Sequence, residues 1–324
     1  MRLLIVTQAV DSKDPILGFF VRWIAEFAKY AERIEIICLK EGEYALPANV
    51  HVYSLGKERA VSRLTYVVNF YRYIWSLRHD YDAVFVHMNP EYVVLGGLLW
   101  RLWGKGISLW YMHKSVNLKL RIAELFANNI FTASKESFRL TGSTKVHVMG
   151  HGIDTEIFSP GPGTMHGTAV LSVGRLSSIK RHDLIIRAAE HIPYDVWIVG
   201  DGPERQHLVE LTKQLSLTKR VHLLGPQTQK QLPDLYRTAG IFVHTSETGS
   251  LDKVVLEALA CGLPVITTNP ALASLPVTVV STTPNAIAKE VVAARIMDTE
   301  PLVSYVREHH SLRKLIPAII RTLS

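Results

Sequence analysis

The residues most suited to chemistry lie in three short loops, each of which follows an apolar run. The loops read GRLSSIKR (174–181), GDGPER (200–205) and SETGSLDK (246–253), and each combines glycine or serine with charged residues. In the first loop, Gly174 lets the backbone turn, and Arg175 and Lys180 supply two cations that could bind a diphosphate together. This arrangement predicts a phosphate-binding site.

The third loop leads into a predicted helix that carries a carboxylate in an apolar run. Gly249 and Ser250 precede the helix, which we expect to begin near Leu251, so that free N–H groups and the positive helix end would face an anion. Glu257 follows about two turns later in VVLEALACG, where it could accept hydrogen bonds from a ribose diol. An unpaired carboxylate there would cost several kcal/mol, on the order of the penalty for desolvating an ion. The alternative is a surface helix whose polar face includes one glutamate.

Apolar runs alternate with amphipathic segments along the whole chain, a pattern typical of parallel α/β sheets. In such sheets ligands bind at the carboxyl ends of the strands, where the three loops would lie. The candidate strands are LLIVT, IEIICL, VHVYSL, AVFVHM, ISLWYM, NIFTAS and KVHVMG in the first half, and VLSVG, DVWIVG, RVHLLG, GIFVHT and PVITT in the second. The helices expected in the first half cover residues 21–30, 62–78, 93–103 and 118–127.

The length of 324 residues predicts two domains. The segment 152–168 is rich in proline and glycine and is predicted to be a linker. Residues 1–151 would form the first domain and residues 169–300 the second. Residues 301–324 have helical periodicity, and such a helix is long enough to cross back to the first domain.

The composition, 48% hydrophobic and 20% charged, is that of a folded globular protein. Cys38 and Cys261 lie in apolar runs far apart in the sequence, so we expect two core thiols in a reducing compartment. The N-terminal apolar run is too short for a signal peptide, and no apolar stretch is long enough to span a bilayer. These features predict a cytoplasmic protein.

The net charge of +7 is unevenly distributed. Residues 57–121 hold ten Lys and Arg against four Asp and Glu, an excess of six, interleaved with tryptophans and tyrosines. On charge alone, this stretch suits nucleic acid, an anionic membrane surface or a phosphorylated ligand. The alternative is a set of ordinary solvated helix faces.

Five segments together resemble a known family. GHGIDTEIF, VLSVGRLSSIKRHDLIIRA, VGDGPERQHL, VHLLGPQTQKQLPDLY and GSLDKVVLEALACGLPVI, in this order, are similar to the retaining nucleotide-sugar glycosyltransferases of group 1, family four. The resemblance implies the α/β GT-B fold, with two Rossmann-like, doubly wound parallel-sheet domains that face a central cleft. It also implies that Arg175 and Lys180 bind the donor diphosphate and that Glu257 binds the ribose. In the first domain, His113 matches a histidine beside the reacting sugar, and Gly18 matches a glycine loop near the donor phosphates.

The sequence departs from this family where a second glutamate usually contacts the donor sugar. That position, eight residues before Glu257, is Gly249, and Glu247 is two residues out of register. Either the backbone N–H groups of Gly249, Ser250 and Leu251 hold the sugar, with Asp252, or the donor differs from the common hexoses. The segment after PVITT also lacks the expected Gly-Gly turn.

The expected function is transfer of a sugar, with retention of configuration, from a nucleoside diphosphate sugar to a glycan or lipid-linked acceptor. The donor is a substrate, and no metal or other cofactor is expected, since Asp80 and Asp82 precede a strand and would lie at the wrong end of the sheet. An anionic membrane surface is an expected partner, which would place the protein on the inner face of the membrane, and nucleic acid is not. The alternatives are a nucleotide-sugar epimerase of the same fold and a non-catalytic binding module. His87, at another strand end, could contact the acceptor or form a core hydrogen bond.

Overall fold

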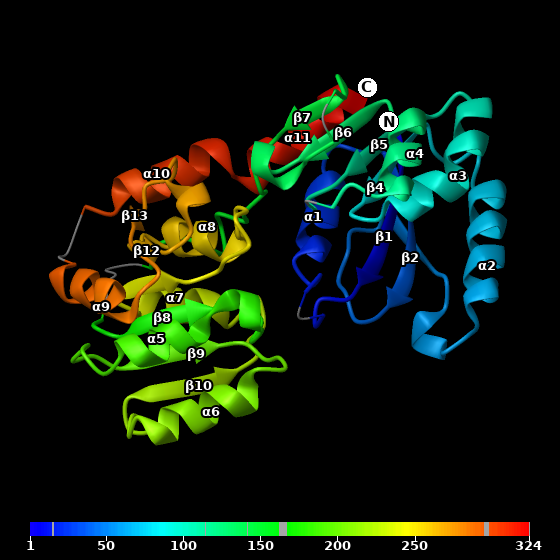
Figure 1. The fold of residues 1–324 in the computed structure, drawn as a ribbon. Coiled ribbons are helices and arrows are strands. Elements are labelled where there is room, and N and C mark those ends of the chain that lie inside the picture. The colour runs from blue at the N-terminus through cyan, green and yellow to red at the C-terminus, as the bar shows by residue number, and fades with distance from the viewer. Residues whose placement is uncertain (15, 114, 141, 162–166, 295–297, 324) are drawn as a thin grey trace. The chain divides into compact units, whose positions relative to one another are not determined.

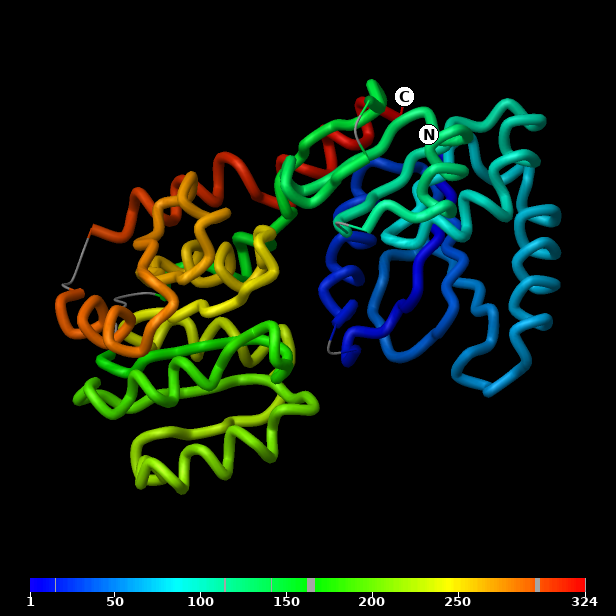
Figure 2. The backbone as a smooth tube through the Cα atoms, in the orientation of Figure 1, coloured from blue at the N-terminus to red at the C-terminus, as the bar shows by residue number. Residues whose placement is uncertain are grey.

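The computed structural model describes residues 1–323 except 15, 114, 141, 162–166 and 295–297. The chain divides into two compact domains. Met1–Gly152 together with Leu312–Ser324 form the first domain, and Ile153–Ser311 form the second. Figure 1 labels most of the elements of both, and Figure 2 follows the backbone of the same chain.

The first domain contains a sheet of seven described strands in the order β3-β2-β1-β4-β5-β6-β7. Every described pairing is parallel; Leu3 of β1, for example, lies between Ile34 of β2 and Ala83 of β4. The strands are β1 (Arg2–Val10), β2 (Arg33–Glu41), β3 (Val50–Ser54), β4 (Ala83–His87), β5 (Gly106–Trp110), β6 (Asn129–Thr132) and β7 (Val146–Val148). The helices are α1 (Phe20–Phe27), α2 (Arg63–Ser76), α3 (Pro90–Leu102), α4 (Leu118–Phe126) and α11 (Leu312–Leu323), with 3-10 turns at Lys57–Arg59 and Lys135–Ser137.

Helices cover both faces of this sheet, which explains why its central strands are apolar runs rather than alternating patterns. Helices α1 and α11 pack on one face, where Trp23 and Ile316 are buried. Helices α2, α3 and α4 pack on the other face, where Phe70 and Trp100 are buried. The sheet therefore has a separate hydrophobic core on each side.

The second domain repeats this plan with six described strands in the order β10-β9-β8-β11-β12-β13, again paired in parallel. The strands are β8 (Val170–Val173), β9 (Val196–Val199), β10 (Val221–Gly225), β11 (Ile241–His244), β12 (Val265–Thr267) and β13 (Thr278–Val279). The helices are α5 (His182–Ala188), α6 (Arg205–Gln214), α7 (Leu232–Thr238), α8 (Lys253–Ala260), α9 (Pro284–Ala293) and α10 (Glu300–His309), with 3-10 turns at Ser178–Lys180 and Pro270–Leu272. One core lies under α7, α8 and α10, and the other under α5, α6 and α9.

The chain passes from one domain to the other at the first residue of the predicted linker, 152–168. The first domain ends at Gly152, and Ile153 already belongs to the second, where Phe158 is buried against Tyr236. Residues 162–166 of the predicted linker lie outside the described part of the chain.

The C-terminal segment, predicted as one helix over 301–324, contains two helices. α10 packs in the second domain, whereas α11 packs against α1 in the first. The backbone of Ile153 bonds to His310 and pairs with Ser311 at this return. Residue 324 lies outside the described part.

Both cysteines are buried and unpaired, as predicted, and burial raises the pKa of each thiol to about 12. None of the helices over the described residues has the length and apolar character needed to cross a bilayer.

Candidate functional site

The three polar loops lie at the carboxyl ends of three strands of the second domain. The first follows β8 and contains a 3-10 turn that leads into α5, the second follows β9, and the third follows β11 and leads into α8. Because β9, β8 and β11 are neighbours in the sheet, the loops lie at one edge, as the sequence predicts. Arg175, in the first loop, is exposed, and its guanidinium has no ion-pair partner in the described part of the chain.

The second loop supports the first through its backbone. The amide of Gly174 donates to Val199 and the amide of Leu176 donates to Asp201, while Leu176 accepts from Glu204, all at 3.0 Å. These bonds satisfy the polar groups of an irregular segment, which would otherwise be costly near a packed core. They hold the backbone on either side of Arg175 in one conformation.

The two glycines of GDGPER make this close approach possible. Gly200 has φ +138°, and a Cβ there would lie 1.9 Å from the carbonyl oxygen of Gly174. Gly202 has φ +159°, and a Cβ there would lie 2.3 Å from the carbonyl oxygen of Leu176. Only glycine adopts such backbone conformations without strain. The glycines therefore have a structural role in shaping the first loop.

The third loop is bonded to the end of the first. The hydroxyl of Thr245 donates to the carbonyls of Lys180 and Arg181, at 2.8 and 3.0 Å, and the amide of Glu247 donates to Ile179. The Glu247 carboxylate forms an ion pair with Arg181 at 2.6 Å. The glutamate that is out of register in the sequence is thus held by a cation of the first loop.

Lys180 lies in a polar cluster between the first and third loops. Its ammonium contacts the Asp252 carboxylate at 2.5 Å and the Ser246 hydroxyl at 3.2 Å. The same carboxylate oxygen, Oδ2, lies 2.8 Å from Nε2 of His244, the last residue of β11. Burial tends to raise the pKa of Asp252, but the hydrogen bond to His244 and the charge of Lys180 hold it well below its usual value. Sequence reasoning did not identify His244, although its position at a strand end is a signal.

Glu257 is almost fully buried in α8, yet it has partners within the domain. Its Oε1 lies 3.1 Å from the Lys253 ammonium, and its Oε2 accepts a hydrogen bond from the Tyr236 hydroxyl at 3.2 Å. Burial and the neighbouring carboxylate raise the pKa of Tyr236, so this hydroxyl stays protonated. The expectation that Glu257 would be unpaired without a ligand was wrong, because the first turn of its own helix supplies a cation.

The start of α8 differs from the sequence expectation by two residues. The helix begins at Lys253 with Asp252 at the N-cap position, rather than near Leu251. Gly249 has φ +59°, in the left-handed region that a side chain with a Cβ disfavours. This loop conformation therefore favours glycine at position 249. The carbonyl of Ser250 accepts from the Asn269 side chain at 3.1 Å.

Residues of the first and second loops line a small pocket of about 120 Å³, among them Ser177 and Glu204, together with His182. His182 is 4% exposed, and its Nδ1 lies 3.3 Å from the Ser172 hydroxyl. Burial, followed by the charges of Lys180 and His244, lowers its pKa to about 4, so the ring is neutral at pH 7.

Of the residues singled out in the first domain, Gly18 and His113 lie in loops, and His87 is the last residue of β4. Gly18 precedes α1, and a Cβ there would lie 2.6 Å from the Asp14 carbonyl oxygen, so close backbone packing requires glycine. His113 is exposed in the loop after β5, beside Tyr111, with a centroid distance of 5.8 Å. His87 is a core residue: it stacks on Phe20 at 3.8 Å, and burial lowers its pKa to about 3.

The acidic pair before β4 lies at the amino end of that strand, as expected, and Asp82 forms an ion pair with Arg2 at 2.6 Å. The described residues contain no group of three or more His, Cys, Asp or Glu side chains placed to hold a metal ion.

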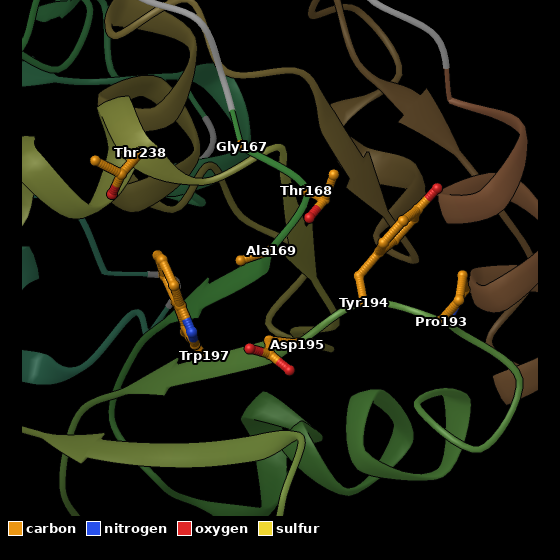
Figure 3. A pocket seen from close by; sticks show the side chains of 8 residues that line it. All are labelled: Gly167, Thr168, Ala169, Pro193, Tyr194, Asp195, Trp197 and Thr238. Carbon is orange, nitrogen blue, oxygen red and sulfur yellow. The ribbon is translucent and has the colours of Figure 1, made fainter.

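A larger pocket, about 350 Å³, lies at the opposite edge of the second sheet (Figure 3). Tyr194, Asp195 and Trp197 line it near the beginning of β9, together with Ala169 before β8. It lies at the amino ends of these strands and is thus separate from the three loops.

Comparison with known sequences finds a family match within the second domain. Residues 157–283 match the model of the glycosyl transferases group 1 family. The D-inositol 3-phosphate glycosyltransferase of Mycobacteroides abscessus is 36% identical over 151 residues, which cover 42% of this chain and 33% of that protein. The enzyme of the same name from Salinispora tropica is 36% identical over 152 residues, 38% of this chain and 32% of that protein. The match thus spans about a third of the length of these relatives.

The similarity to solved structures extends over the whole chain. HepE of Anabaena, crystallised in complex with UDP, has a TM-score of 0.78 at 18% identity and covers 100% of this chain and 99% of its own. WaaG, a glycosyltransferase involved in lipopolysaccharide biosynthesis, has a TM-score of 0.70 at 15% identity and covers 99% of both chains. At these identities the similarity concerns the fold, which is GT-B, as the sequence predicts.

We expect Gly200→Ala to destabilise the second domain by at least about 2 kcal/mol, because the methyl group would overlap the Gly174 carbonyl in a backbone conformation that only glycine tolerates. Urea unfolding would measure the loss. Gly106→Ala is the control, since a Cβ there would meet nothing within 4 Å. Equal stability of the two variants would contradict the packing of the first two loops.

Proposed function

Because residues 157–283 match the group 1 glycosyltransferases and the chain has the GT-B fold, we propose that it transfers a sugar from a nucleoside diphosphate sugar to a glycan or lipid-linked acceptor. The observation that carries this proposal is the pair of cations in the first loop, Arg175 and Lys180, at the carboxyl end of β8. Arginine and lysine side chains at such a position suit a diphosphate.

Stabilisation of the leaving group would be the main catalytic contribution. As the bond between the sugar and the diphosphate breaks, negative charge grows on the phosphate oxygens, and preorganised cations lower the energy of that state. In this proposal Arg175 and Lys180 supply the cations without a metal ion, and configuration is retained. The backbone N–H groups from Gly249 to Leu251 would add to the donor site, and Glu257 would bind the ribose. In the first domain, the loops of Gly18 and His113 would serve the donor phosphates and the reacting sugar.

The function is tested with a panel of nucleotide sugars that begins with UDP-glucose, because HepE has been crystallised in complex with it. Transfer would release the nucleoside diphosphate when an acceptor is present. A nucleotide at a hundredfold its dissociation constant should raise the stability by about 2.7 kcal/mol, measurable by thermal shift. Epimerised nucleotide sugar formed without an acceptor would identify an epimerase instead. Binding without any turnover would identify a non-catalytic module.

Arg175→Ala and Lys180→Ala should each lower the turnover number by about a hundredfold to a thousandfold, the usual loss for one preorganised donor to a developing anion. Because both cations serve one diphosphate, the double variant should lose less than the product of the two single effects. Steady-state kinetics with the donor would measure both.

The control for these variants is Arg187→Ala, which removes an exposed arginine of α5. It should leave turnover unchanged. Normal turnover of both single variants with the true donor would contradict the role of the first loop and the mechanism proposed from it.

Glu257→Gln should weaken donor binding by roughly 1.5 to 3 kcal/mol, because the amide keeps the volume and can accept from Tyr236 but loses the charge-assisted bond to the ribose. Calorimetric titration with the donor would measure this loss, with Glu290→Gln on α9 as the control. An unchanged donor affinity would leave Glu257 with a structural role as the partner of Lys253 and Tyr236.

We also propose that the first domain binds an anionic membrane, where a lipid-linked acceptor would be available. Helix α2 has an exposed apolar stripe at helical spacing, formed by Leu64 (72% exposed), Val68 (57%), Tyr71 (38%) and Trp75 (57%). Leu98 and Leu102 on α3 and Leu118 and Leu125 on α4 are also exposed. Large exposed apolar patches mark interaction surfaces.

Basic side chains accompany this stripe and favour an anionic partner. Arg63 and Arg72 on α2 and Arg101 on α3 are exposed, and the Arg78 guanidinium lies 5.0 Å from the centre of the Trp75 ring. Each Lys or Arg near an anionic surface contributes about 1 kcal/mol, and salt screens the attraction within about 10 Å. The apolar stripe would enter the interface while the arginines contact headgroups, on the inner face of the membrane.

At low salt, the protein should float with vesicles that contain anionic lipid, and the double variant Leu64→Ala, Trp75→Ala should bind them about tenfold or more weakly, because two exposed apolar anchors are lost. Val292→Ala, which changes an exposed apolar residue of α9, should bind like the wild type. If the wild-type protein does not float with these vesicles, the membrane proposal fails and a soluble acceptor is favoured.

A further inference from the structure

Asp252 occupies the N-cap position of α8 but does not cap this helix. Its backbone is extended, as an N-cap requires, yet its side chain makes no capping hydrogen bond. An aspartate here normally accepts a hydrogen bond from an amide of the first turn, which stabilises the helix. The carboxylate contacts Lys180 and His244 instead. The helix therefore lacks the stabilisation of a side-chain cap at this position.

These contacts belong to a chain of four interacting side chains, which begins at the end of β12 and consists of Thr267, His244, Asp252 and Lys180. The backbone amide of Asn269 donates to Oγ1 of Thr267, Oγ1 lies 3.0 Å from Nδ1 of His244, and Nε2 of His244 lies 2.8 Å from Oδ2 of Asp252. Since an ionised carboxylate only accepts hydrogen bonds, the His244 Nε2 must carry a proton. The Asp252 carboxylate is therefore oriented by a donor that is itself held between two strands.

The chain ends on the one lysine of the first loop. Lys180 Nζ lies 2.5 Å from the same oxygen, Oδ2. The side chain of His244 is 4% exposed, that of Asp252 16% and that of Lys180 21%, so the cluster is largely shielded from solvent. A lysine has a flexible stem and a point charge, and needs a partner to hold its ammonium in one place. Asp252 is such a partner.

This contact has two opposite consequences for a bound diphosphate. The negative charge of Asp252 beside Lys180 opposes an anionic ligand and weakens its binding. The fixed position of the ammonium, however, avoids reorganisation when charge develops on the leaving group, which favours the transition state. A residue with both effects should separate nucleotide affinity from turnover.

We propose that Asp252, oriented by His244, is a positioning residue that holds the Lys180 ammonium toward the departing diphosphate. This inference rests on the proposed transferase function and assigns a role to a carboxylate of the third loop that does not itself contact the phosphates. It also gives His244, through its hydrogen bond to Asp252, an indirect part in turnover.

The main test is Asp252→Asn, which keeps the size of the side chain and removes its charge. Turnover should fall tenfold or more, whereas the dissociation constant for UDP should stay the same or decrease, since a repulsive charge is removed. If Asp252 had a purely structural role, Asp252→Asn would either leave turnover unchanged or lower turnover and weaken UDP binding together. Asp234→Asn, which changes an aspartate of α7 paired with Arg237 at 3.3 Å, is the control and should change neither.

A double-mutant cycle tests whether Asp252 acts through Lys180. In the Lys180→Ala background, Asp252→Asn should lower turnover by less than twofold. A loss equal to the product of the two single effects would overturn the inference. His244→Gln, whose side-chain nitrogen can donate in place of Nε2, should keep most of the turnover, whereas His244→Leu should lose as much as Asp252→Asn.

A readout without substrate separates this inference from the proposed function. In ¹⁵N-labelled protein, the Lys180 ammonium held by Asp252 should give an NMR cross-peak that both Lys180→Ala and Asp252→Asn abolish. Its absence in the wild-type protein, or its persistence in Asp252→Asn, would overturn the positioning even if the transferase is active. A wild-type protein that shows the cross-peak but neither binds a nucleoside diphosphate nor turns over a nucleotide sugar would overturn the proposed function and the use of Lys180 in it.

Discussion

The candidate site depends on the backbone contact between the first two loops of the second domain. Leu176 uses both its amide and its carbonyl to bond the GDGPER segment, and the approach is close enough that neither glycine of that segment can carry a side chain. Irregular backbone at a sheet edge must find partners for its polar groups, and here each loop supplies them to the other. Backbone hydrogen bonds therefore hold the loop that carries Arg175 and Lys180 in place. The side chains of these two residues are not needed for this contact.

The cations of the loops differ in how they are held. Arg175 is exposed, Arg181 is tied to Glu247, and Lys180 is tied to the largely buried Asp252. If these loops bind a diphosphate, as proposed, cations that already have carboxylate partners would bind it more weakly than free cations, but their charges would be fixed in advance. Such an arrangement would suit the proposed departure of the leaving group, because preorganised charge lowers a barrier more than charge that must move into place.

The fold was predictable from periodicity, because strands buried on both faces appear as continuous apolar runs and crossover helices as amphipathic ones. The helix predicted over residues 62–78, for example, is α2 (Arg63–Ser76). The short exposed strand β13 was not predicted, since two residues carry no pattern. The division of the C-terminal segment into α10 and α11 was also missed, because periodicity shows that a segment is helical but not which core it joins.

The sequence was sufficient to predict which loops form the candidate site, but not which of their side chains contact one another. Strand ends locate the loops, and glycine marks the backbone turns, so residues such as Arg175 and Gly249 could be singled out. Which carboxylate pairs with which cation depends on loop geometry that spans about 70 positions in the sequence, as between Lys180 and Asp252. Glu257 shows the consequence most clearly. Its burial in an apolar run suggested a missing ligand, yet a lysine four residues earlier and a tyrosine from α7 satisfy it. A buried charge in a sequence therefore indicates that a partner exists, and only the three-dimensional arrangement shows whether that partner belongs to the protein or to a ligand.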